Sequence, residues 1–235
     1  MDDKEKKGVS SKFILPDLAI LDPLLTTNLP ANITASTGID AMVHAIEAFT
    51  SINSNNNPVS KMLSIEALKL LGSSIKTAVF DGHNINARSN MLLGSMLAGK
   101  AFANSPVAAV HALAYPIGGL FNISHGLSNS LVLTSVMKFN SKNKETKKNY
   151  AHLAPYVFKN LDNSKNDEFL CNNFIDGLER LCKELNLPYR LRDLEIPEEA
   201  CKLMASEAMK QTRLLVNNPR KIEESDAYNI YKSVW

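Results

Sequence analysis

The spacing of apolar residues along the chain is helical over most of its length. After Pro30, apolar side chains recur through Ile33, Val43, Ile46 and Phe49, at the period of a helix with a buried face. A polar cluster at residues 51–58 ends this helix. The same pattern predicts further helices at about residues 59–80, 85–104, 107–118, 125–138, 144–160, 167–186, 197–214 and 223–234. The pattern therefore predicts an all-α fold.

The first thirty residues follow a different pattern. A short apolar run from Phe13 to Leu21 is closed by Asp22 and Pro23, which predicts one strand followed by a turn. We therefore expect two parts, a β-containing leader at residues 1–30 and an α-helical domain at residues 31–235.

Composition and charge exclude several classes of protein. The net charge is +2, from 26 basic and 24 acidic residues, which provides no field for holding nucleic acid. The polar N-terminus has no apolar segment behind it, and the charge-free stretch from Ala101 to Met137 is interrupted by Pro, Gly and Asn, which predicts buried core rather than a membrane span. Cys171, Cys182 and Cys201 form no C-x-x-C pair and predict neither a disulfide framework nor a thiolate zinc site. We expect a cytoplasmic protein without a membrane partner.

One helix carries polar residues that need explaining. Asp40 and His44 are four residues apart and therefore share a helical face, with Cβ atoms about 5–6 Å apart. They suit two ligands of one cation, although two such residues taken alone more often form a plain ion pair on a helix surface. Because their neighbours are apolar, the helix is predicted to be buried, where a carboxylate needs a compensating cation or hydrogen bonds. Glu47 lies on the same face; we favour a carboxylate that accepts a hydrogen bond from an imidazole N–H over a solvated carboxylate.

Two more histidines lie in the charge-free stretch. His111 and His125 are either neutral core histidines bonded to carbonyls or ligands. Between them, Gly118 and Gly119 predict a helix end followed by re-entry into a new helix, which can fold His125 back towards His111. Tyr115, on the same helical face as His111, either relays a proton or lines a pocket.

The four candidate ligands form one donor set. Asp40, His44, His111 and His125 together offer one carboxylate oxygen and three imidazoles, which suits Fe²⁺ or Zn²⁺ better than Ca²⁺, Mg²⁺ or Cu⁺. The remaining histidines, His83 in a polar turn and His152 in a charged helix, are predicted to be surface residues.

The chain resembles the iron-containing (group III) alcohol dehydrogenases, whose members include lactaldehyde/propanediol and 1,3-propanediol dehydrogenases. The similarity extends over almost the whole chain. The segments that carry it are 15–23, 29–30, 37–47, 111–119 and 124–126.

The resemblance implies a fold, a reaction and a set of roles. It implies a helical metal-binding domain in which Asp40, His44, His111 and His125 hold the metal, with hydride transfer between a primary alcohol and NAD or NADP. Tyr115 stands where many members have a histidine that relays the substrate proton. By the same resemblance Pro23 lies in a turn that lines the cofactor cleft, and residues 1–30 are the end of an α/β nucleotide-binding domain.

One departure from the family limits these implications. No G-x-G-x-x-G or other glycine-rich phosphate loop occurs in the 235 residues, and this loop normally supplies affinity for the cofactor. We therefore expect weak or no activity from the chain alone, with NAD(P) bound largely by an absent domain. The expected partners are a small alcohol or aldehyde and either a second copy of the chain or a separately encoded cofactor-binding half. The alternatives are a non-catalytic remnant or interaction module, and a zinc enzyme of the glycerol dehydrogenase type.

Overall fold

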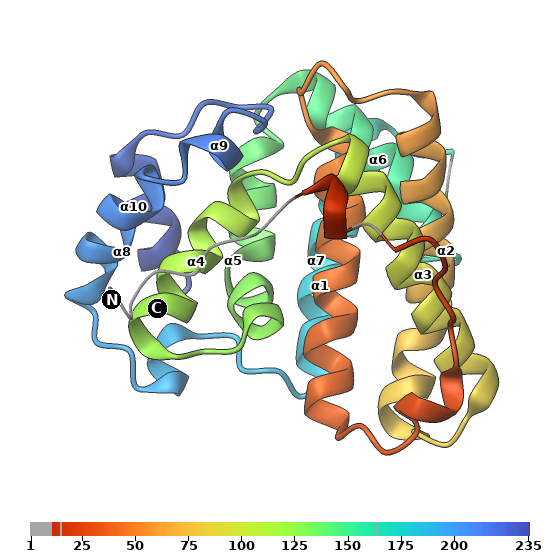
Figure 1. Cartoon of the computed structure of the whole chain (residues 1–235). Coiled ribbons are helices and arrows are strands. Elements are labelled where there is room, and N and C mark those ends of the chain that lie inside the picture. Colours follow the sequence, from red (N-terminus) through yellow and green to blue (C-terminus); the bar gives the residue numbers. More distant parts are fainter. Residues whose placement is uncertain (1–10, 15, 163) are drawn as a thin grey trace.

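A computed structural model describes residues 11–14, 16–162 and 164–235 of the chain. Within these ranges every regular element is a helix (Figure 1), which confirms the all-α prediction. The α-helices are α1 (Ala31–Thr50), α2 (Pro58–Phe80), α3 (Ile85–Asn104), α4 (Ala109–Phe121), α5 (His125–Asn140), α6 (Lys144–Val157), α7 (Asp167–Glu184), α8 (Ala200–Met209), α9 (Thr212–Leu215) and α10 (Glu224–Ser233). Three short 3-10 helices are η1 (Lys12–Ile14), η2 (Pro23–Thr26) and η3 (Leu191–Leu194).

Helix α1 lies at the centre of the molecule. It packs against α2 and α3 on one side and against α5 on the other, while α4 pairs with α5 and with α8 (Figure 1). Most of its side chains from Thr34 to Thr50 are buried, as the sequence predicts. A helix enclosed in this way can present polar groups to a protected site between its neighbours.

Asparagines start several of the other helices. The side chains of Asn57, Asn84, Asn143 and Asn166 each accept hydrogen bonds from backbone N–H groups in the first turns of α2, α3, α6 and α7. Such caps satisfy donors that have no partner within the helix. The asparagine-rich connections therefore set where these helices begin.

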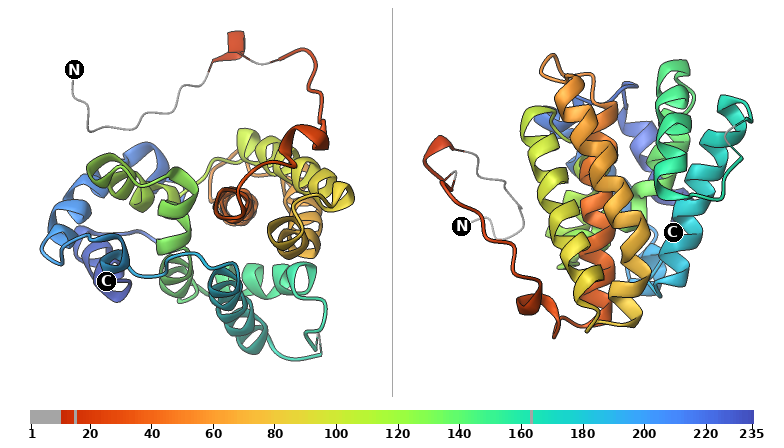
Figure 2. Two further views of the ribbon diagram at one scale, coloured as in Figure 1. Left: turned by 90° about the horizontal axis from the view of Figure 1, so that it is seen from below. Right: turned by 90° about the vertical axis from the view of Figure 1, so that its right-hand side faces the viewer.

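The leader lacks the predicted strand. The described residues between 11 and 22 run apart from the helical body (Figure 2), with η1 at their start and no strand among them; Leu15 lies outside the described residues. A strand needs a neighbouring strand for its backbone hydrogen bonds, and the described helices offer none. The turn at Asp22 is real, because its side chain accepts a hydrogen bond from the N–H of Leu24 and starts η2.

The join between leader and body is held by a buried arginine. Arg88 donates to the carbonyl of Gly82 at 2.8 Å, to Thr34 Oγ1 at 2.7 Å and to the carbonyl of Leu29 at 3.4 Å. These bonds connect the last leader residues to the start of α1 and to the α2–α3 turn. They fix the point from which the leader leaves the helices.

Two other predictions were wrong in detail. Helix α4 continues through both glycines to Phe121, and the next residue, Asn122, takes the left-handed conformation with φ 55°. Asparagine tolerates this conformation, and Leu120 and Phe121 gain core contacts in the extra turn. The helix predicted at 197–214 is divided into α8 and α9, because Gln211 leaves the helical region with ψ 48°.

The charge-free stretch forms the last turn of α3, all of α4 and most of α5, and lies largely in the core. Among the described residues, no helix combines the length and the apolarity that a bilayer-crossing segment needs. Cys171, Cys182 and Cys201 are buried and free.

Candidate metal centre

Four side chains from α1, α4 and α5 converge at one point. The ligating atoms of Asp40, His44, His111 and His125 all lie within 4.8 Å of one another. His111 Nε2 is 3.1 Å from His44 Nε2, and Asp40 Oδ1 is 3.8 Å from Nε2 of both His111 and His125. These separations approach those of side chains that share one ion, whose ligand atoms lie about 2.1 Å from it. The structure thus brings together the four residues selected from the sequence.

A buried carboxylate fixes the histidine on α4. Glu47 Oε2 accepts a hydrogen bond from His111 Nδ1 at 2.7 Å and from the N–H of Ala108 at 3.0 Å, while Glu47 Oε1 accepts from the N–H of Val110 at 2.6 Å. Glu47 therefore orients the imidazole and also satisfies N–H groups at the start of α4, where no residue of α4's own cap does so. The predicted bond from Glu47 to an imidazole is confirmed.

The network around Glu47 also assigns the tautomer of His111. An ionised carboxylate only accepts hydrogen bonds, so Nδ1 of His111 carries the proton. In the neutral ring, Nε2 then presents a lone pair towards His44 and Asp40. This is the form in which an imidazole binds a metal.

His44 is also held in its neutral form. Burial, and next the neighbouring His111, lower its pKa from 6.5 to about 4 against the opposing effect of Asp40. Its ring stacks on Phe102 of α3, with centroids 4.7 Å apart. At neutral pH this imidazole therefore offers a lone pair to the cluster.

The histidine on α5 is placed by a reversal of the chain and a close helix contact. The left-handed residue Asn122 ends α4 and lets the chain turn back, so that α5 begins directly at His125. Next to it, a Cβ on Gly126 would overlap the backbone carbonyl of Ser36 in α1. Only glycine allows α5 to approach α1 this closely. The His125 side chain remains 41% exposed, compared with 3% for His111.

Tyr115 lies at the open side of the cluster. Its ring centroid is 6.0 Å from that of His125. Burial is the main cause that raises the pKa of its phenol above 10. The hydroxyl therefore keeps its proton at neutral pH and can donate a hydrogen bond.

The remaining predicted residues lie apart from the cluster. Pro23 is the first residue of η2, which contacts α3. His83 and His152 are exposed, as predicted.

The sequence reasoning missed Asn129. Its Nδ2 lies 2.5 Å from Asp40 Oδ1 and 3.3 Å from His125 Nε2. The available signal was its position four residues after His125 on the same helix, which places the two side chains on one face.

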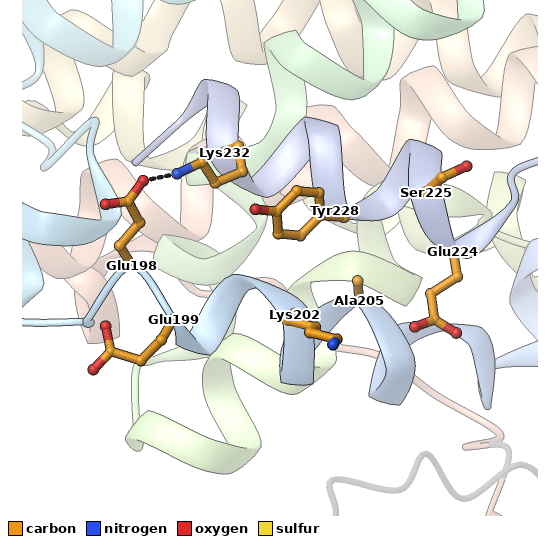
Figure 3. Close-up of a pocket in the computed structure, with 8 residues that line it drawn as sticks. All are labelled: Glu198, Glu199, Lys202, Ala205, Glu224, Ser225, Tyr228 and Lys232. Carbon is orange, nitrogen blue, oxygen red and sulfur yellow. Dashed lines mark ion pairs between the residues drawn. The ribbon is translucent and has the colours of Figure 1, made fainter.

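A separate pocket lies between α8 and α10 (Figure 3). Glu198 pairs with Lys232 at one end, and Tyr228 lies between the helices. The walls carry three carboxylates and two amines: Glu198, Glu199, Glu224, Lys202 and Lys232. These charges are mixed and selective for no single ion, and none of the converging residues lines this pocket. We therefore place the chemistry at the cluster between α1, α4 and α5.

The comparisons with known proteins agree with this geometry. The sequence model that describes the C-terminal part of the Fe-containing alcohol dehydrogenase family matches residues 34–235. The chain is 37% identical to long-chain-alcohol dehydrogenase 1 of Geobacillus thermodenitrificans, in an alignment covering 98% of this chain and 57% of that protein. It thus spans a little over half the length of such relatives.

Solved structures show the same fold. A crystal structure of 1,3-propanediol oxidoreductase superimposes with a TM-score of 0.85 and 33% identity, covering 91% of this chain and 55% of that one. Sulfoacetaldehyde reductase from Bifidobacterium kashiwanohense, crystallised in complex with NAD⁺, gives a TM-score of 0.83 and 26% identity, with 96% and 56% coverage. The family match, the shared fold and the converging side chains together show that this chain belongs to the iron-containing alcohol dehydrogenase family and corresponds to its C-terminal domain.

Proposed function

We propose that the chain is the metal-binding part of an NAD(P)-linked alcohol dehydrogenase that acts on a small primary alcohol or the corresponding aldehyde. The observation that carries this proposal is the convergence of Asp40, His44, His111 and His125 within 4.8 Å in a chain of this family. The NAD⁺ complex of a relative supports a nicotinamide cofactor.

The donor set fits a divalent metal ion. Three imidazoles and one carboxylate suit Fe²⁺, our first choice, or Zn²⁺. Glu47 leaves a lone pair on His111 Nε2, and the lowered pKa of His44 leaves one on its imidazole. A cation held by these groups supplies Lewis-acid chemistry at the substrate oxygen.

The chain's own residues define the side from which substrate approaches. The His125 side chain is 41% exposed, compared with 3% for that of His111, and Tyr115 lies next to His125. We propose that substrate enters on this side and that Tyr115 holds the proton exchanged with it. Tyr115→Phe in the complete enzyme tests this role: proton relay requires a changed pH profile of kcat, whereas a pocket-lining role requires only a changed KM.

We propose that the cofactor is bound mainly by another α/β polypeptide segment and that the leader docks on it. Leu18, Ile20 and Leu25 are 76%, 81% and 82% exposed, and apolar side chains gathered on one segment mark an interaction surface. We propose that Pro23, which lies between Ile20 and Leu25 in this segment, then faces the cofactor. Burial of the same side chains between two copies of the chain is the competing arrangement, and the mass of the protein in solution distinguishes the two.

The metal site is tested by comparing two histidines. His111→Ala removes a buried candidate ligand, whereas His83→Ala removes an exposed imidazole outside the cluster. After anaerobic loading with Fe²⁺, we expect about one metal ion per chain in the wild type and in His83→Ala, and strong loss in His111→Ala. Equal metal contents in the two variants would contradict the ligand assignment.

Activity is tested with a chimera. The part of the Geobacillus relative that this chain does not span is joined in front of the leader, and NADH formation from primary alcohols is followed after loading with Fe²⁺ or Zn²⁺. We expect turnover by the chimera and little or none by the 235 residues alone. A folded, metal-loaded chimera without turnover would favour a non-catalytic metal-binding module. A preference for Zn²⁺ would favour the glycerol dehydrogenase type.

A further inference from the structure

We propose that Asn129 is a positioning residue of the metal centre, which fixes the carboxylate of Asp40 for the cation. This inference rests on the proposed metal site and assigns a role to a residue outside the four candidate ligands. The geometry that carries it is the contact of one buried amide with the cluster from the α5 side.

Asn129 meets the cluster through its amide nitrogen. It lies one helical turn after His125, and its Nδ2 is 2.5 Å from Asp40 Oδ1 and 3.3 Å from His125 Nε2. Asp40 Oδ1 is also the carboxylate oxygen that lies 3.8 Å from Nε2 of both His111 and His125. The amide therefore holds the very oxygen that faces the imidazoles.

A carboxylate oxygen can accept this bond and still bind a cation. Each oxygen has two lone-pair directions, so a donor on one of them leaves the other available. With its Oδ1 held, the Asp40 side chain loses rotational freedom before a metal arrives. Partners of metal ligands act in this way, and their loss typically weakens metal binding 10- to 100-fold.

The rest of the Asn129 side chain argues against a role in folding alone. Asn129 is 0% exposed, and its Oδ1 accepts no hydrogen bond from any residue in the described ranges. A buried acceptor without a donor costs stability, and an apolar side chain at this position avoids that cost. The orientation of the amide follows from its partner, since turning it would bring Oδ1 against the Asp40 carboxylate. The amide at this position is therefore explained by its N–H group, which donates a hydrogen bond to Asp40.

The experiment separates metal affinity from stability. Asn129→Leu keeps the approximate volume, removes the donor and removes the orphaned oxygen. We expect the variant chain, freed of metal with a chelator, to melt at the same temperature as the wild type or higher. Its affinity for Zn²⁺ and Co²⁺, measured in competition with a chromophoric chelator, should fall 10- to 100-fold. The visible spectrum of the Co²⁺ form should also change, because it reports ligand geometry.

A matched control removes another buried oxygen that has no hydrogen-bond partner in the described ranges, Oγ of Ser64. Ser64, on α2, is 0% exposed and its Oγ is likewise without a partner in the described ranges, yet α2 carries none of the four clustered residues. Ser64→Ala should leave metal affinity and the Co²⁺ spectrum unchanged. If the leucine variant does not fold, Asn129→Ala provides the same comparison with a smaller side chain.

The outcomes distinguish this inference from the proposed function. If the wild type binds neither ion, the metal site itself is wrong. If the wild type binds and an Asn129 variant binds equally well with an unchanged spectrum, only the positioning role fails. A variant that loses stability in proportion to its loss of affinity would assign Asn129 to core packing and overturn the inference.

Discussion

The two sides of the cluster are built differently. On the α4 side, Glu47 accepts one hydrogen bond from the His111 imidazole and two from the N–H groups of Ala108 and Val110, and the His111 side chain is 3% exposed. On the α5 side, the His125 side chain is 41% exposed, and the amide nitrogen of Asn129 lies 3.3 Å from His125 Nε2 and bonds to Asp40. The first side is held by a buried carboxylate, and the second by a buried amide together with the close approach of α5 to α1.

This difference separates two requirements of a metal centre that must admit a substrate. A rigid, dry side keeps the imidazole in one tautomer and at one position. A more exposed side leaves room for a small molecule to approach. Changes to the Glu47 network on the α4 side should therefore alter stability and metal binding together, whereas a change of the Asn129 side chain on the α5 side should act on metal binding more selectively.

The largest expected effect comes from Glu47. Glu47→Ala leaves the His111 imidazole and the N–H groups of Ala108 and Val110 without their acceptor in a buried site. Because unsatisfied buried donors cost about 1–3 kcal/mol each, we expect a loss of roughly 4 kcal/mol in the free energy of unfolding. Urea denaturation of the metal-free chain measures it. Glu47→Gln, which keeps one acceptor oxygen, should lose much less; equal losses would show that the hydrogen bonds are not the cause.

A smaller effect should appear as pH is lowered on the metal-free chain. His44 has a folded pKa of about 4 and an ordinary pKa of 6.5. Between these values the unfolded chain binds a proton that the folded chain does not. The stabilisation is therefore complete above pH 6.5 and is lost as pH falls towards 4, by at most about 3 kcal/mol. Urea titrations between pH 7 and 4 should show this slope.

A matched variant isolates the contribution of His44 to the pH dependence. In His44→Gln the slope of unfolding free energy between pH 7 and 4 should be reduced. If the slope is as steep as in the wild type, other groups on the α4 side or beyond it control the acid sensitivity.

The smallest expected change in stability comes from alanine substitutions at two glycines, one in a close helix contact and one in open space. Gly126→Ala forces α5 away from Ser36 in α1, and overpacking of this kind costs about 1–3 kcal/mol. It should also weaken metal binding, because His125 and Asn129 move with α5. Gly99 in α3 has open space where a Cβ would lie, so Gly99→Ala should stabilise the chain by about 0.5–1 kcal/mol. Thermal melts and metal titrations of both variants provide the test; equal behaviour would refute the importance of the α1–α5 approach.

Sequence reasoning succeeded where one helix carries the information. Asp40, His44 and Glu47 share a face because 3.6 residues make a turn, and that face is indeed turned into the molecule. It failed for the predicted strand, because a strand is completed by a partner that the described helices do not provide. It also failed for the end of α4, where core contacts of Leu120 and Phe121 outweigh the glycines before them.

The amino-acid sequence by itself determined the helices, the types of donor and the pairs that lie one turn apart, since these depend on local periodicity. Only the tertiary structure decided that Glu47 binds His111 and that Asn129 binds Asp40, residues 64 and 89 positions apart. Contacts across helices depend on how closely whole elements pack, as Gly126 against Ser36 shows. Such packing is the sum of many weak contacts along the chain, and no short segment contains it.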